Sequence, residues 1–423
     1  MDVKWEGART TIALDPESPD YAAHWDAQTR DLRRKCPVAW SREHGGFWVV
    51  TRYADVLSVA QQDAAFTNGK TFDPATGHVE GGVALPPMKI GRLIPAEVDR
   101  EEWELFRGLL NPRLGPKAAE GYRAAARGYA EALLDRVIGR GEMDLVQDFT
   151  SPMTALVTMT LVGFPLAEWR RFADPLHDLT SLNKSTPEYE EALAAAAWVD
   201  GRIDEEIAAR KAKPQDDLIG HLVAARVEGA PLRDEDIHQT IVNVLFGGVD
   251  TTTALTSHTL FHLWRHPDQR ARLKADRSLL TVAREEFIRF FTPSHGSART
   301  AHREACIAGQ NIAAGDILYI IFASANRDAD VFERPDEIDI DRFPNRHIGF
   351  GAGIHRCVGS FMARMMFEVM MNAVLDRLPD YEVDAAAAAR YPTISPINGW
   401  VNMPITFTPG ARSGNRVPDW LGE

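Results

Sequence analysis

One glycine-rich stretch surrounds a cysteine at Phe350–Gly359 and reads FGAGIHRCVG. Its glycines permit tight backbone turns that aim N–H groups at the sulfur of Cys357. The pattern predicts that this cysteine opens an amphipathic helix over about 358–378. Free N–H groups at a helix N-terminus stabilise a thiolate. From these residues alone Cys357 could be a nucleophile, a metal ligand or an inert buried thiol.

The composition is typical of a soluble globular protein, since 45% of the 423 residues are hydrophobic and 25% are charged. The formal net charge of −13 disfavours nucleic acid and anionic membranes as partners. The sequence shows no secretory signal and no apolar run of about 18–20 residues, so we expect no membrane partner. The three cysteines, Cys36, Cys306 and Cys357, form no disulfide or zinc pattern, which favours a cytoplasmic location.

Helical patterns dominate the chain, and no linker or internal repeat divides it. We therefore expect one large domain over 1–423 with a small β-rich lobe. The lobe is predicted at about 37–70, 299–325 and 391–409, and its clearest strand is the run GFWVVT at 46–51.

Two further segments stand out from the coarse pattern. Residues 69–95 hold many glycines and prolines and predict a long irregular segment, which in a compact domain is typical of a functional lid. From about residue 100 to 273 the pattern is helical, and we expect breaks at several prolines, Pro112 among them. The longest helical run is predicted over 234–266.

That longest run contains the hexapeptide GGVDTT at 247–252. Two glycines inside a helix cost about 1 kcal/mol each against alanine, so something is expected to approach the backbone closely. A threonine hydroxyl can also bond back to the carbonyl one turn earlier and bend the helix. A kinked helix crossing is the alternative explanation of the same residues.

The cysteine stretch resembles the haem-thiolate loop of the cytochromes P450, F-x-x-G-x-H-x-C-x-G. The matching residues are Phe350, Gly353, His355, Cys357 and Gly359. The resemblance covers nearly the whole chain, from the strand near residue 48 onward. It implies the cytochrome P450 fold, which is mainly α, with a large helical domain and a small β-rich lobe.

Glu286-Phe-Ile-Arg289 resembles the E-x-x-R helix of the same family, at the expected distance before the cysteine. Arg342 matches the third member of that ion network. The resemblance implies a structural role for these three residues, which is to hold the cysteine loop in place.

The resemblance also implies haem b, with the Cys357 thiolate as the axial ligand of the iron. Arg299 and His355 match propionate-binding positions. Many bacterial members carry H-x-x-x-R near residue 100, whereas this chain has Trp103 and Arg107 at those places. The full set of predicted cofactor-binding residues is Cys357, His355, Arg299, Arg107, Trp103, Phe350 and Gly351.

In the family this bulge of the helix binds O2 and its acid–alcohol pair delivers protons, and Asp250 and Thr251 match that pair. The implied activity is a monooxygenase that inserts one oxygen atom from O2 into a hydrophobic small molecule by hydroxylation or epoxidation. Electrons are expected from a separate ferredoxin and ferredoxin reductase. Residues that could form a basic face for an acidic ferredoxin are Arg107, Arg113, Lys117, Arg346, His347, Arg356 and Arg364.

The substrate pocket is predicted from position relative to these motifs. Asn243 and His295 are its polar groups, so we expect a hydrophobic substrate with at least one oxygen function. Alternatively, His295 points elsewhere and hydrogen-bonds the backbone. The predicted lining residues are Leu85 and Met88 of the 72–95 loop, Asn243, Phe246, Gly247, His295 and Ile397.

Three other functions remain open. A peroxide-driven peroxygenase would share the fold but typically lacks the pair at Asp250 and Thr251. A non-catalytic haem sensor would need neither that pair nor a covered pocket. A cysteine hydrolase would need a base beside Cys357, and His355 is the only near candidate.

Overall fold

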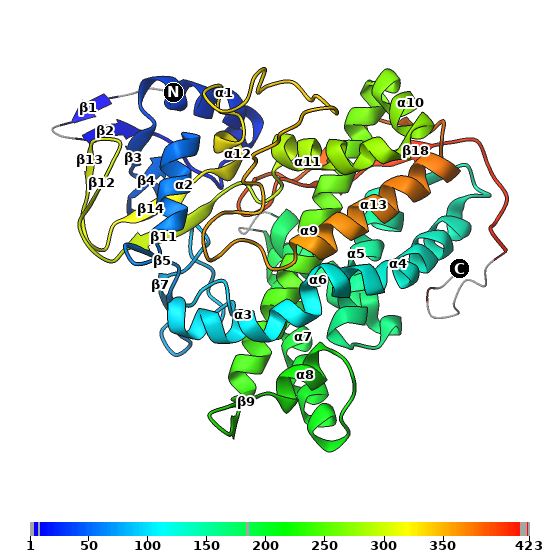
Figure 1. Cartoon of the computed structure of the whole chain (residues 1–423), viewed down its shortest axis with the longest axis horizontal. Coiled ribbons are helices and arrows are strands. Elements are labelled where there is room, and N and C mark those ends of the chain that lie inside the picture. The colour runs from blue at the N-terminus through cyan, green and yellow to red at the C-terminus, as the bar shows by residue number, and fades with distance from the viewer. Residues whose placement is uncertain (1–3, 7–8, 183–185, 415–420, 422–423) are drawn as a thin grey trace. The chain divides into compact units, whose positions relative to one another are not determined.

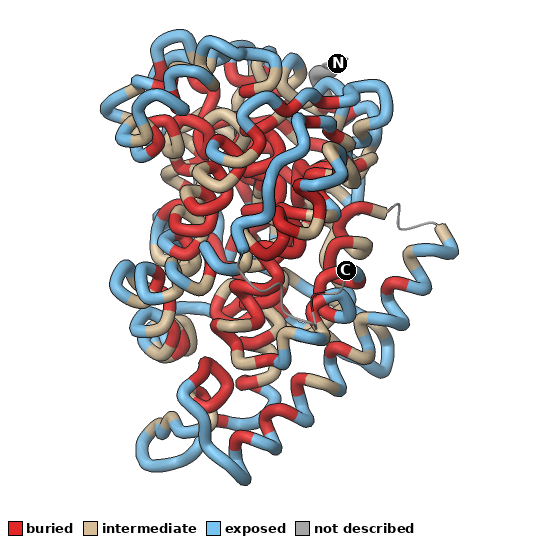
Figure 2. The backbone as a smooth tube through the Cα atoms, turned by 90° about the vertical axis from the view of Figure 1, so that its right-hand side faces the viewer, coloured by how far each residue is buried: buried red, intermediate tan, exposed pale blue. Residues whose placement is uncertain are grey.

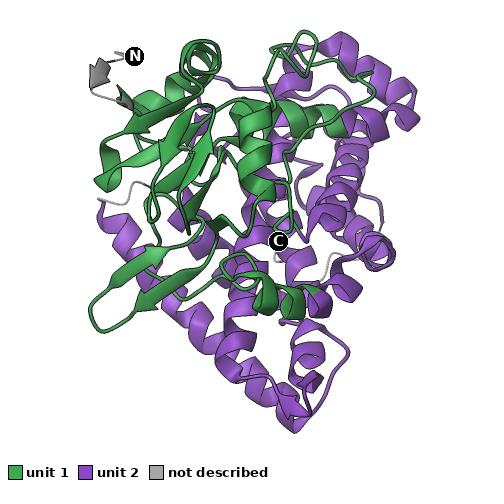
Figure 3. Cartoon of the chain, turned by 60° about the vertical axis from the view of Figure 1, so that its left-hand side comes forward, with its two compact units in different colours: residues 1–107, 285–357, 392–398 green, residues 108–284, 358–391, 399–423 purple. Residues whose placement is uncertain are grey.

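The computed structural model describes residues 4–6, 9–182, 186–414 and 421. The chain divides into two compact units, which Figure 3 shows in green and purple. We call residues 1–107, 285–357 and 392–398 the sheet unit. The remainder, residues 108–284, 358–391 and 399–423, is the helical unit. The sequence predicted one domain with a β-rich lobe, and the sheet unit holds most of the residues assigned to that lobe.

A seven-stranded sheet forms the centre of the sheet unit (Figure 1). Two neighbouring pairs, β2 with β3 and β4 with β14, are parallel, and the others are antiparallel. In spatial order the strands are β1 (Lys4–Glu6), β2 (Arg9–Ile12), β3 (Val38–Ser41), β4 (Phe47–Val50), β14 (Ile317–Ile320), β11 (Ser297–Ala301) and β5 (Phe66–Thr67).

The interior strand β4 explains why this sheet is stable. Its sequence FWVV is aromatic and β-branched, and all four side chains are fully buried. A strand with both faces covered carries a continuous apolar run instead of an alternating one. The strand predicted at 46–51 is therefore confirmed. The N-terminal strands β1 and β2 extend the sheet beyond the predicted lobe.

The other elements of the sheet unit are short. Two hairpins lie outside the main sheet, β6 with β7 and β12 with β13, and the second lies within the predicted lobe segment 299–325. The elements are α1 (Pro19–Lys35), a 3-10 turn (Glu43–Gly45), α2 (Tyr53–Gln61), β6 (Lys70–Asp73), β7 (His78–Gly81), β12 (Ala305–Ile307), β13 (Gln310–Ile312) and α12 (Phe322–Ala325).

Two predicted boundaries need correction. The segment 69–95 is not irregular throughout, because β6 and β7 pair over its first part with four residues in register. The segment 391–409 was assigned to the β-rich lobe, but only 392–398 belongs to the sheet unit. The strands at 400–406 pair with partners of the helical unit, because Tyr391 N–H already bonds Gly399 C=O and starts a separate ribbon there.

A buried ion pair between Lys70 and Glu97 stabilises the irregular part of the chain that follows β7. The Glu97 carboxylate accepts hydrogen bonds from the backbone N–H groups of Val83 and Leu93, at 3.1 and 2.9 Å. Lys70 Nζ lies 3.3 Å from the same carboxylate, and each of the two charged side chains is only 1% exposed. One buried carboxylate thus joins both ends of an otherwise irregular loop.

The helical unit contains most of the long helices (Figure 1). Its helices are α4 (Pro116–Val137), α5 (Ser151–Val162), α6 (Trp169–Ser181), α7 (Pro187–Ala212), α8 (Leu218–Ala224), α9 (Asp234–Arg265), α10 (Pro267–Ala275) and α13 (Ser360–Arg377). Short 3-10 or π turns lie at Val146–Thr150, Leu166–Glu168 and Arg277–Leu279, and the strands are β8 (Glu142–Asp144), β9 (Arg226–Val227), β10 (Ala230–Pro231), β15 (Glu382–Val383), β16 (Ala389–Arg390), β17 (Trp400–Asn402) and β18 (Pro404–Thr406).

The long helix α9 is the axis of this unit, and its 32 residues confirm the run predicted over 234–266. Three acidic residues lie in its first turn, where the positive end of the helix dipole stabilises negative charge. Helix α5 packs against it, and every residue of α5 except Thr160 is buried. Figure 2 shows in red the buried stretches of the chain. An apolar helix buried on all sides is typical of the core of a large protein.

Two of the five boundaries between the units fall inside helices, in α3 (Arg100–Leu114) and α11 (Leu280–Phe291). The break expected at Pro112 is wrong, because α3 continues to Leu114. Pro112 stands near the C-terminal end of the helix, where its missing N–H removes a single backbone bond and its fixed φ remains helical. In the described part of the chain no helix is long and apolar enough to cross a membrane.

The buried pair predicts that Lys70→Met destabilises the loop. This change leaves the Glu97 charge buried without a cation, which costs about 3–5 kcal/mol. We expect limited proteolysis to cut the chain faster within residues 82–96, and the urea midpoint of unfolding to fall. Arg100→Met is the control, because Arg100 is 55% exposed and its pair with Asp63 contributes about 1 kcal/mol or less. Equal cleavage rates in the two variants would contradict a structural role for the buried pair.

Candidate functional site

The cysteine loop of the sheet unit is a tight backbone turn. The Cys357 N–H donates to the Phe350 carbonyl at 2.8 Å, and the Gly351 N–H donates to the Ile348 carbonyl at 2.9 Å. Gly351 and Gly353 both have φ near +70°, a conformation that favours glycine. A Cβ on Gly353 would lie 2.1 Å from the Ala60 carbonyl oxygen, so no larger residue fits there.

The position of Cys357 relative to the next helix differs from the expectation. Helix α13 begins at Ser360, with Gly359 as its N-cap, so Cys357 lies three residues before the first helical residue. Gly359 has φ −80° and ψ 5°, a turn conformation that delays the helix. The Cys357 residue itself is exposed.

Basic and N–H-bearing side chains gather beside this loop, and all lie in the sheet unit. Burial lowers the pKa of Arg107, and the neighbouring Cys357 opposes that shift. Arg107 donates to the Arg356 carbonyl at 2.7 Å, and its guanidinium lies 5.9 Å from the centre of the Trp103 ring. The Trp103 ring in turn meets His355 edge-on, with the ring centres 6.2 Å apart.

The histidine of the loop is held neutral. Burial lowers the pKa of His355 to about 4, and the positive charges of Arg299 and Arg107 add to this shift. The structure thus brings together Trp103, Arg107, Arg299 and His355, as the sequence predicted for a cofactor site. The same low pKa makes His355 a weak base, which disfavours the hydrolase alternative.

Two of these groups have a buried nitrogen without a hydrogen-bond partner among the described residues, and a third, Arg299, has no acidic partner there. Trp103 Nε1 and His355 Nδ1 are buried and have no hydrogen-bond partner among the described residues. Arg299 is 4% exposed, and burial lowers its pKa to about 10. It donates to the Ser297 hydroxyl and the Ala298 carbonyl, and no acidic side chain of the described residues pairs with it.

Buried cations and donors are stable when an anion or an acceptor satisfies them. The two propionates of haem b supply two carboxylates, and the buried Arg299 cation and the unmatched nitrogens of His355 and Trp103 are the complementary groups. The residues present therefore fit haem b, which the Cys357 sulfur would hold through its iron. Phe350 contributes the carbonyl that binds the Cys357 N–H, and Gly351 the turn beside it.

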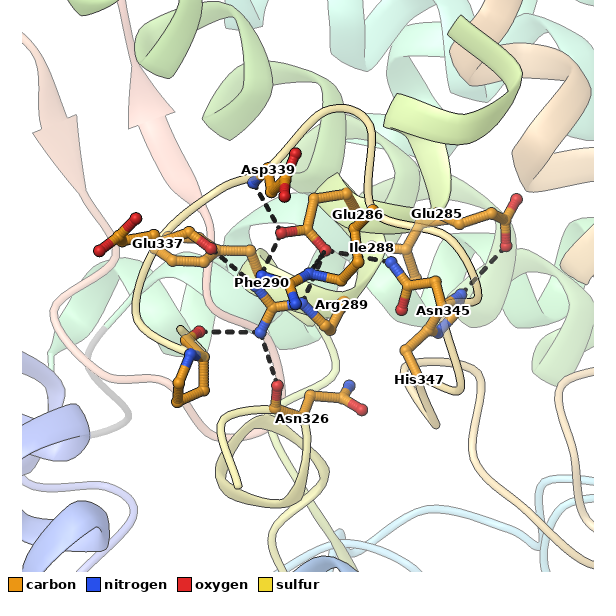
Figure 4. Close-up of polar contacts among 12 residues, drawn as sticks. Glu285, Glu286, Ile288, Arg289, Phe290, Asn326, Glu337, Asp339, Asn345 and His347 are labelled. Carbon is orange, nitrogen blue, oxygen red and sulfur yellow. Dashed lines mark hydrogen bonds and ion pairs between the residues drawn. The ribbon is translucent and has the colours of Figure 1, made fainter. Parts of the chain in front are cut away.

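An ion network on α11 holds the segment that leads into the loop (Figure 4). Arg289 Nε and Nη2 donate to the Glu286 carboxylate at 2.7 and 2.8 Å, and both side chains are fully buried. Arg342 Nε and Asn345 Nδ2 each lie 3.0 Å from Glu286 Oε2. The three predicted members, Glu286, Arg289 and Arg342, are thus in contact.

Arg289 also binds the backbone of the segment that leads into the cysteine loop. Its Nη groups donate to the carbonyls of Asn326, Pro335 and Glu337 at 2.8–2.9 Å. Asn326 Oδ1 accepts from the Ile348 N–H at 2.8 Å, directly before the cysteine loop. The sequence analysis did not include Asn326 or Asn345, because a single asparagine in a meander carries no motif.

The pair at Asp250 and Thr251 lies in the middle of α9, in the helical unit. The Thr251 hydroxyl donates to the Gly247 carbonyl at 3.1 Å, which is the back-bond expected one turn earlier. Packing requires a glycine at only one of the two positions, 248. A Cβ on Gly248 would lie 2.6 Å from the Thr158 hydroxyl of α5, whereas a Cβ on Gly247 would meet nothing within 4 Å.

The Asp250 carboxylate is 2% exposed and has three donors around it. Thr180 and Tyr391 donate to Oδ2 at 2.5 and 2.6 Å, and His177 Nδ1 lies 3.1 Å from Oδ1. Sequence reasoning missed all three partners. They lie 70 to 141 residues away along the chain, so no local spacing could indicate them.

The predicted pocket residues belong to both units. Leu85, Met88, His295 and Ile397 lie in the sheet unit, and Asn243, Phe246 and Gly247 lie on α9. Leu85 and Ile397 are buried, and the others except His295 are partly or fully accessible. Their joint role in one pocket stays a prediction.

His295 is fully buried and already has a partner. Its Nε2 lies 2.8 Å from the Tyr21 hydroxyl, and Trp25 meets the ring edge-on with the centres 4.9 Å apart. Burial lowers its pKa to about 3. The alternative of a backbone bond is not what the side chain forms, since its partner is a tyrosine of α1. Its Nδ1 has no partner in the described part of the protein.

Comparison with known proteins bears on these sites. A family model described as cytochrome P450 matches residues 46–383. The chain is 30% identical to a steroid C26-monooxygenase of Mycobacterium tuberculosis, over 92% of this chain and 95% of that protein. It is also 30% identical to linalool 8-monooxygenase of Pseudomonas putida, over 89% and 94% of the two chains. A solved Mycobacterium marinum cytochrome P450 in complex with pseudoionone superposes with a TM-score of 0.84 at 27% identity, covering 95% and 100%.

The ion network predicts that Arg289→Lys is strongly destabilising. Lysine keeps the charge but has only three donors, so it cannot replace the two carboxylate bonds and three carbonyl bonds of the guanidinium. We expect a loss of about 2–4 kcal/mol in the free energy of unfolding, measured with urea. Arg334→Lys is the matched control, because Arg334 is 55% exposed and its ion pairs with Glu337 and Asp339 contribute little. A loss for Arg289→Lys no larger than that of the control would disprove the role of the network.

The buried His295 predicts a stability that falls in acid. Its folded pKa is about 3, below the ordinary value of about 6.5, so the unfolded chain binds more protons as the pH drops below 6.5. Between pH 6.5 and 5 this residue alone should cost about 2 kcal/mol of unfolding free energy. His295→Gln should flatten that part of the pH–stability curve relative to wild type. Parallel curves for the two proteins would refute the assignment.

Proposed function

The chain belongs to the cytochrome P450 family and is a monooxygenase that uses haem b and O2, and we propose that it inserts one oxygen atom into a hydrophobic small molecule by hydroxylation or epoxidation. We further propose that a separate ferredoxin and its reductase supply the electrons. The cytoplasmic location also remains a proposal, which cell fractionation would test.

The proposed cofactor site is supported by buried polar groups around the cysteine loop that have no acidic partner or no hydrogen-bond partner among the described residues. Haem bound through the Cys357 thiolate supplies the activation of O2. The chain supplies the sulfur, the carbonyl and N–H pattern that fixes the loop, and the buried Arg299 for a propionate. His355 and Trp103 each add one unmatched buried nitrogen, and His355 stays neutral because its pKa is about 4.

We propose that Asp250 and Thr251 deliver protons for O2 activation. Asp250 is buried and hydrogen-bonded, so its carboxylate is held in one place beside the Thr251 residue. The Thr251 hydroxyl has its proton directed at the Gly247 carbonyl, where no Cβ blocks the approach to the helix backbone. This arrangement favours a monooxygenase over a peroxygenase, which has no need of a buried acid at this place.

We propose a hydrophobic substrate that carries at least one oxygen function. Relatives are named for a steroid and for linalool, and one similar structure holds pseudoionone. Leu85 and Ile397 are buried apolar residues of the predicted lining, and His295 Nδ1 is a buried polar atom without a partner in the described residues. A pocket that is mostly apolar with a few polar groups suits such a molecule.

The basic face expected for a ferredoxin is weaker than the sequence indicates. Arg113 pairs with Asp216 at 2.6 Å, and His347 pairs with Glu285 at 3.0 Å, so two of its members face acidic neighbours. The proposal of a separate electron donor therefore depends on turnover, and each alternative function predicts a different result there.

The first test is the absorption spectrum of the reduced, carbon-monoxide-bound protein beside Cys357→His. Thiolate ligation predicts a strongly red-shifted Soret band in wild type and its loss in the variant. Turnover is then compared with a surrogate ferredoxin system and with peroxide alone. Ferredoxin-dependent product supports the monooxygenase, peroxide-only product supports the peroxygenase, and bound haem without turnover supports the sensor. A red-shifted band that survives the substitution would disprove the role of Cys357.

A further inference from the structure

Four side chains of the helical unit form a buried polar cluster that no sequence motif indicates. Asp250 comes from α9, His177 and Thr180 come from α6, and Tyr391 directly follows β16. We call these four residues the carboxylate cluster. All four are buried, and three separate segments of the chain contribute to it.

The hydrogen bonds of the cluster define where the protons lie. The Tyr391 and Thr180 hydroxyls donate to Asp250 Oδ2, at 2.6 and 2.5 Å. His177 Nδ1 lies 3.1 Å from Asp250 Oδ1 and 3.0 Å from the Tyr391 oxygen, whose own proton points to Oδ2. Both neighbours of Nδ1 are therefore acceptors, so Nδ1 must carry a proton.

The remaining question is the other ring nitrogen, His177 Nε2. It is buried and has no hydrogen-bond partner among the described residues. If Nε2 is also protonated, His177 is a cation beside a buried carboxylate. If it is not, Asp250 is a buried anion that only neutral donors stabilise, which is costly in a low-dielectric interior.

The surrounding charges favour the cation. No lysine or arginine of the described residues pairs with Asp250, so His177 is the basic group available to it. Burial by itself lowers the pKa of His177, but the hydrogen bond and charge of Asp250 raise it, and Asp178 and Asp174 on α6 add to the rise. The net result is a pKa above the ordinary histidine value. Tyr391 stays neutral, since burial and Asp250 raise its pKa well above the usual range.

We propose that His177 and Asp250 act as one coupled proton site, in which His177 is a positioning residue that stores the proton that Asp250 delivers, while Thr180 and Tyr391 hold the carboxylate in place. This inference rests on the proposed role of Asp250 in proton delivery.

The transfer is a single proton shift within the pair. The Nδ1–H bond of the imidazolium breaks and an O–H bond forms at Oδ1, across the 3.1 Å contact. The ring is left neutral with its proton on Nε2, and Asp250 becomes a neutral carboxylic acid. After Asp250 passes its proton on, the pair carries one net negative charge, and uptake of one proton from bulk solvent at Nδ1 restores the imidazolium. No change in charge of the cluster occurs until that proton leaves.

The direct test is nuclear magnetic resonance of the reduced, carbon-monoxide-bound holoenzyme. Long-range proton–nitrogen spectra report the charge state of each of the 13 histidines. The signals absent from His177→Asn, or from His177→Gln if the first variant does not fold, identify His177. We expect both ring nitrogens to be protonated at pH 6.5 and somewhat above it. At higher pH the ring should lose one proton, and the signals of both nitrogens should shift at the same pH. A ring that is neutral at pH 6.5 overturns the proposal.

The second test separates a proton store from a structural link between α6 and the rest of the cluster. Asparagine can keep a neutral donor near the Nδ1 position but cannot titrate. In wild type the fraction of electrons recovered in product should fall as the pH rises through the raised pKa of His177. In His177→Asn that fraction should be at least several-fold lower and independent of pH. His258→Asn is the control, because His258 is another buried histidine of the same helical unit, bonded to Trp400 at 3.0 Å, and it should keep the wild-type pH dependence.

The two proposals fail in different ways. If Asp250→Asn leaves the product fraction unchanged, Asp250 does not deliver protons, although the charged pair can still be seen by resonance. If Asp250→Asn abolishes product while His177→Asn keeps the wild-type pH dependence, the function stands and the coupled site is wrong. A fall in unfolding temperature between pH 6.5 and the pKa of His177 that vanishes in His177→Asn supports the pair, because its stabilisation is complete below pH 6.5 and lost above that pKa.

Discussion

The fully buried ion pair between Glu286 and Arg289 is the constraint on which the cysteine loop depends. Removing two charges from water is expensive, and the cost is offset only where every donor and acceptor is satisfied. Here Arg289 uses its guanidinium on one carboxylate and three carbonyls, and Glu286 adds bonds from Arg342 and Asn345. Several hydrogen bonds thereby tie the segment that leads into Cys357 to helix α11. The cysteine loop, which contains two glycines with positive φ, therefore starts from a segment of fixed position.

Much of the architecture was predictable from the sequence, for physical reasons that differ among elements. The strand at 47–50 is aromatic and β-branched throughout, and the helix at 234–265 carries a long apolar period, so each has one stable solution. The hairpin at 70–81 was missed because its alternation is short and its sequence is rich in turn residues. The fate of residues 400–406 was missed because the pairing partner of a short strand is chosen by tertiary packing.

The candidate site also contains some residues that the sequence predicted and others that it could not. Trp103, Arg107, Arg299 and His355 were predicted from motif positions, and the structure brings them together beside Cys357. The partners of Asp250 could not be predicted, since His177, Thr180 and Tyr391 come from distant segments and are ordinary residues in their local sequence. His295 shows the converse, because its position indicated a polar pocket residue while packing against α1 gives its Nε2 a tyrosine partner.

The carboxylate of Glu97 has a consequence for molecular recognition. By holding the amides of Val83 and Leu93, it keeps the intervening backbone in one conformation before any ligand arrives. Ordering a residue costs about 1–2 kcal/mol of conformational entropy, and a segment that is already ordered does not incur that loss on binding. Discrimination among ligands by these residues would then resemble a rigid template, in which a poorly shaped molecule is rejected by steric clash and not accommodated by rearrangement.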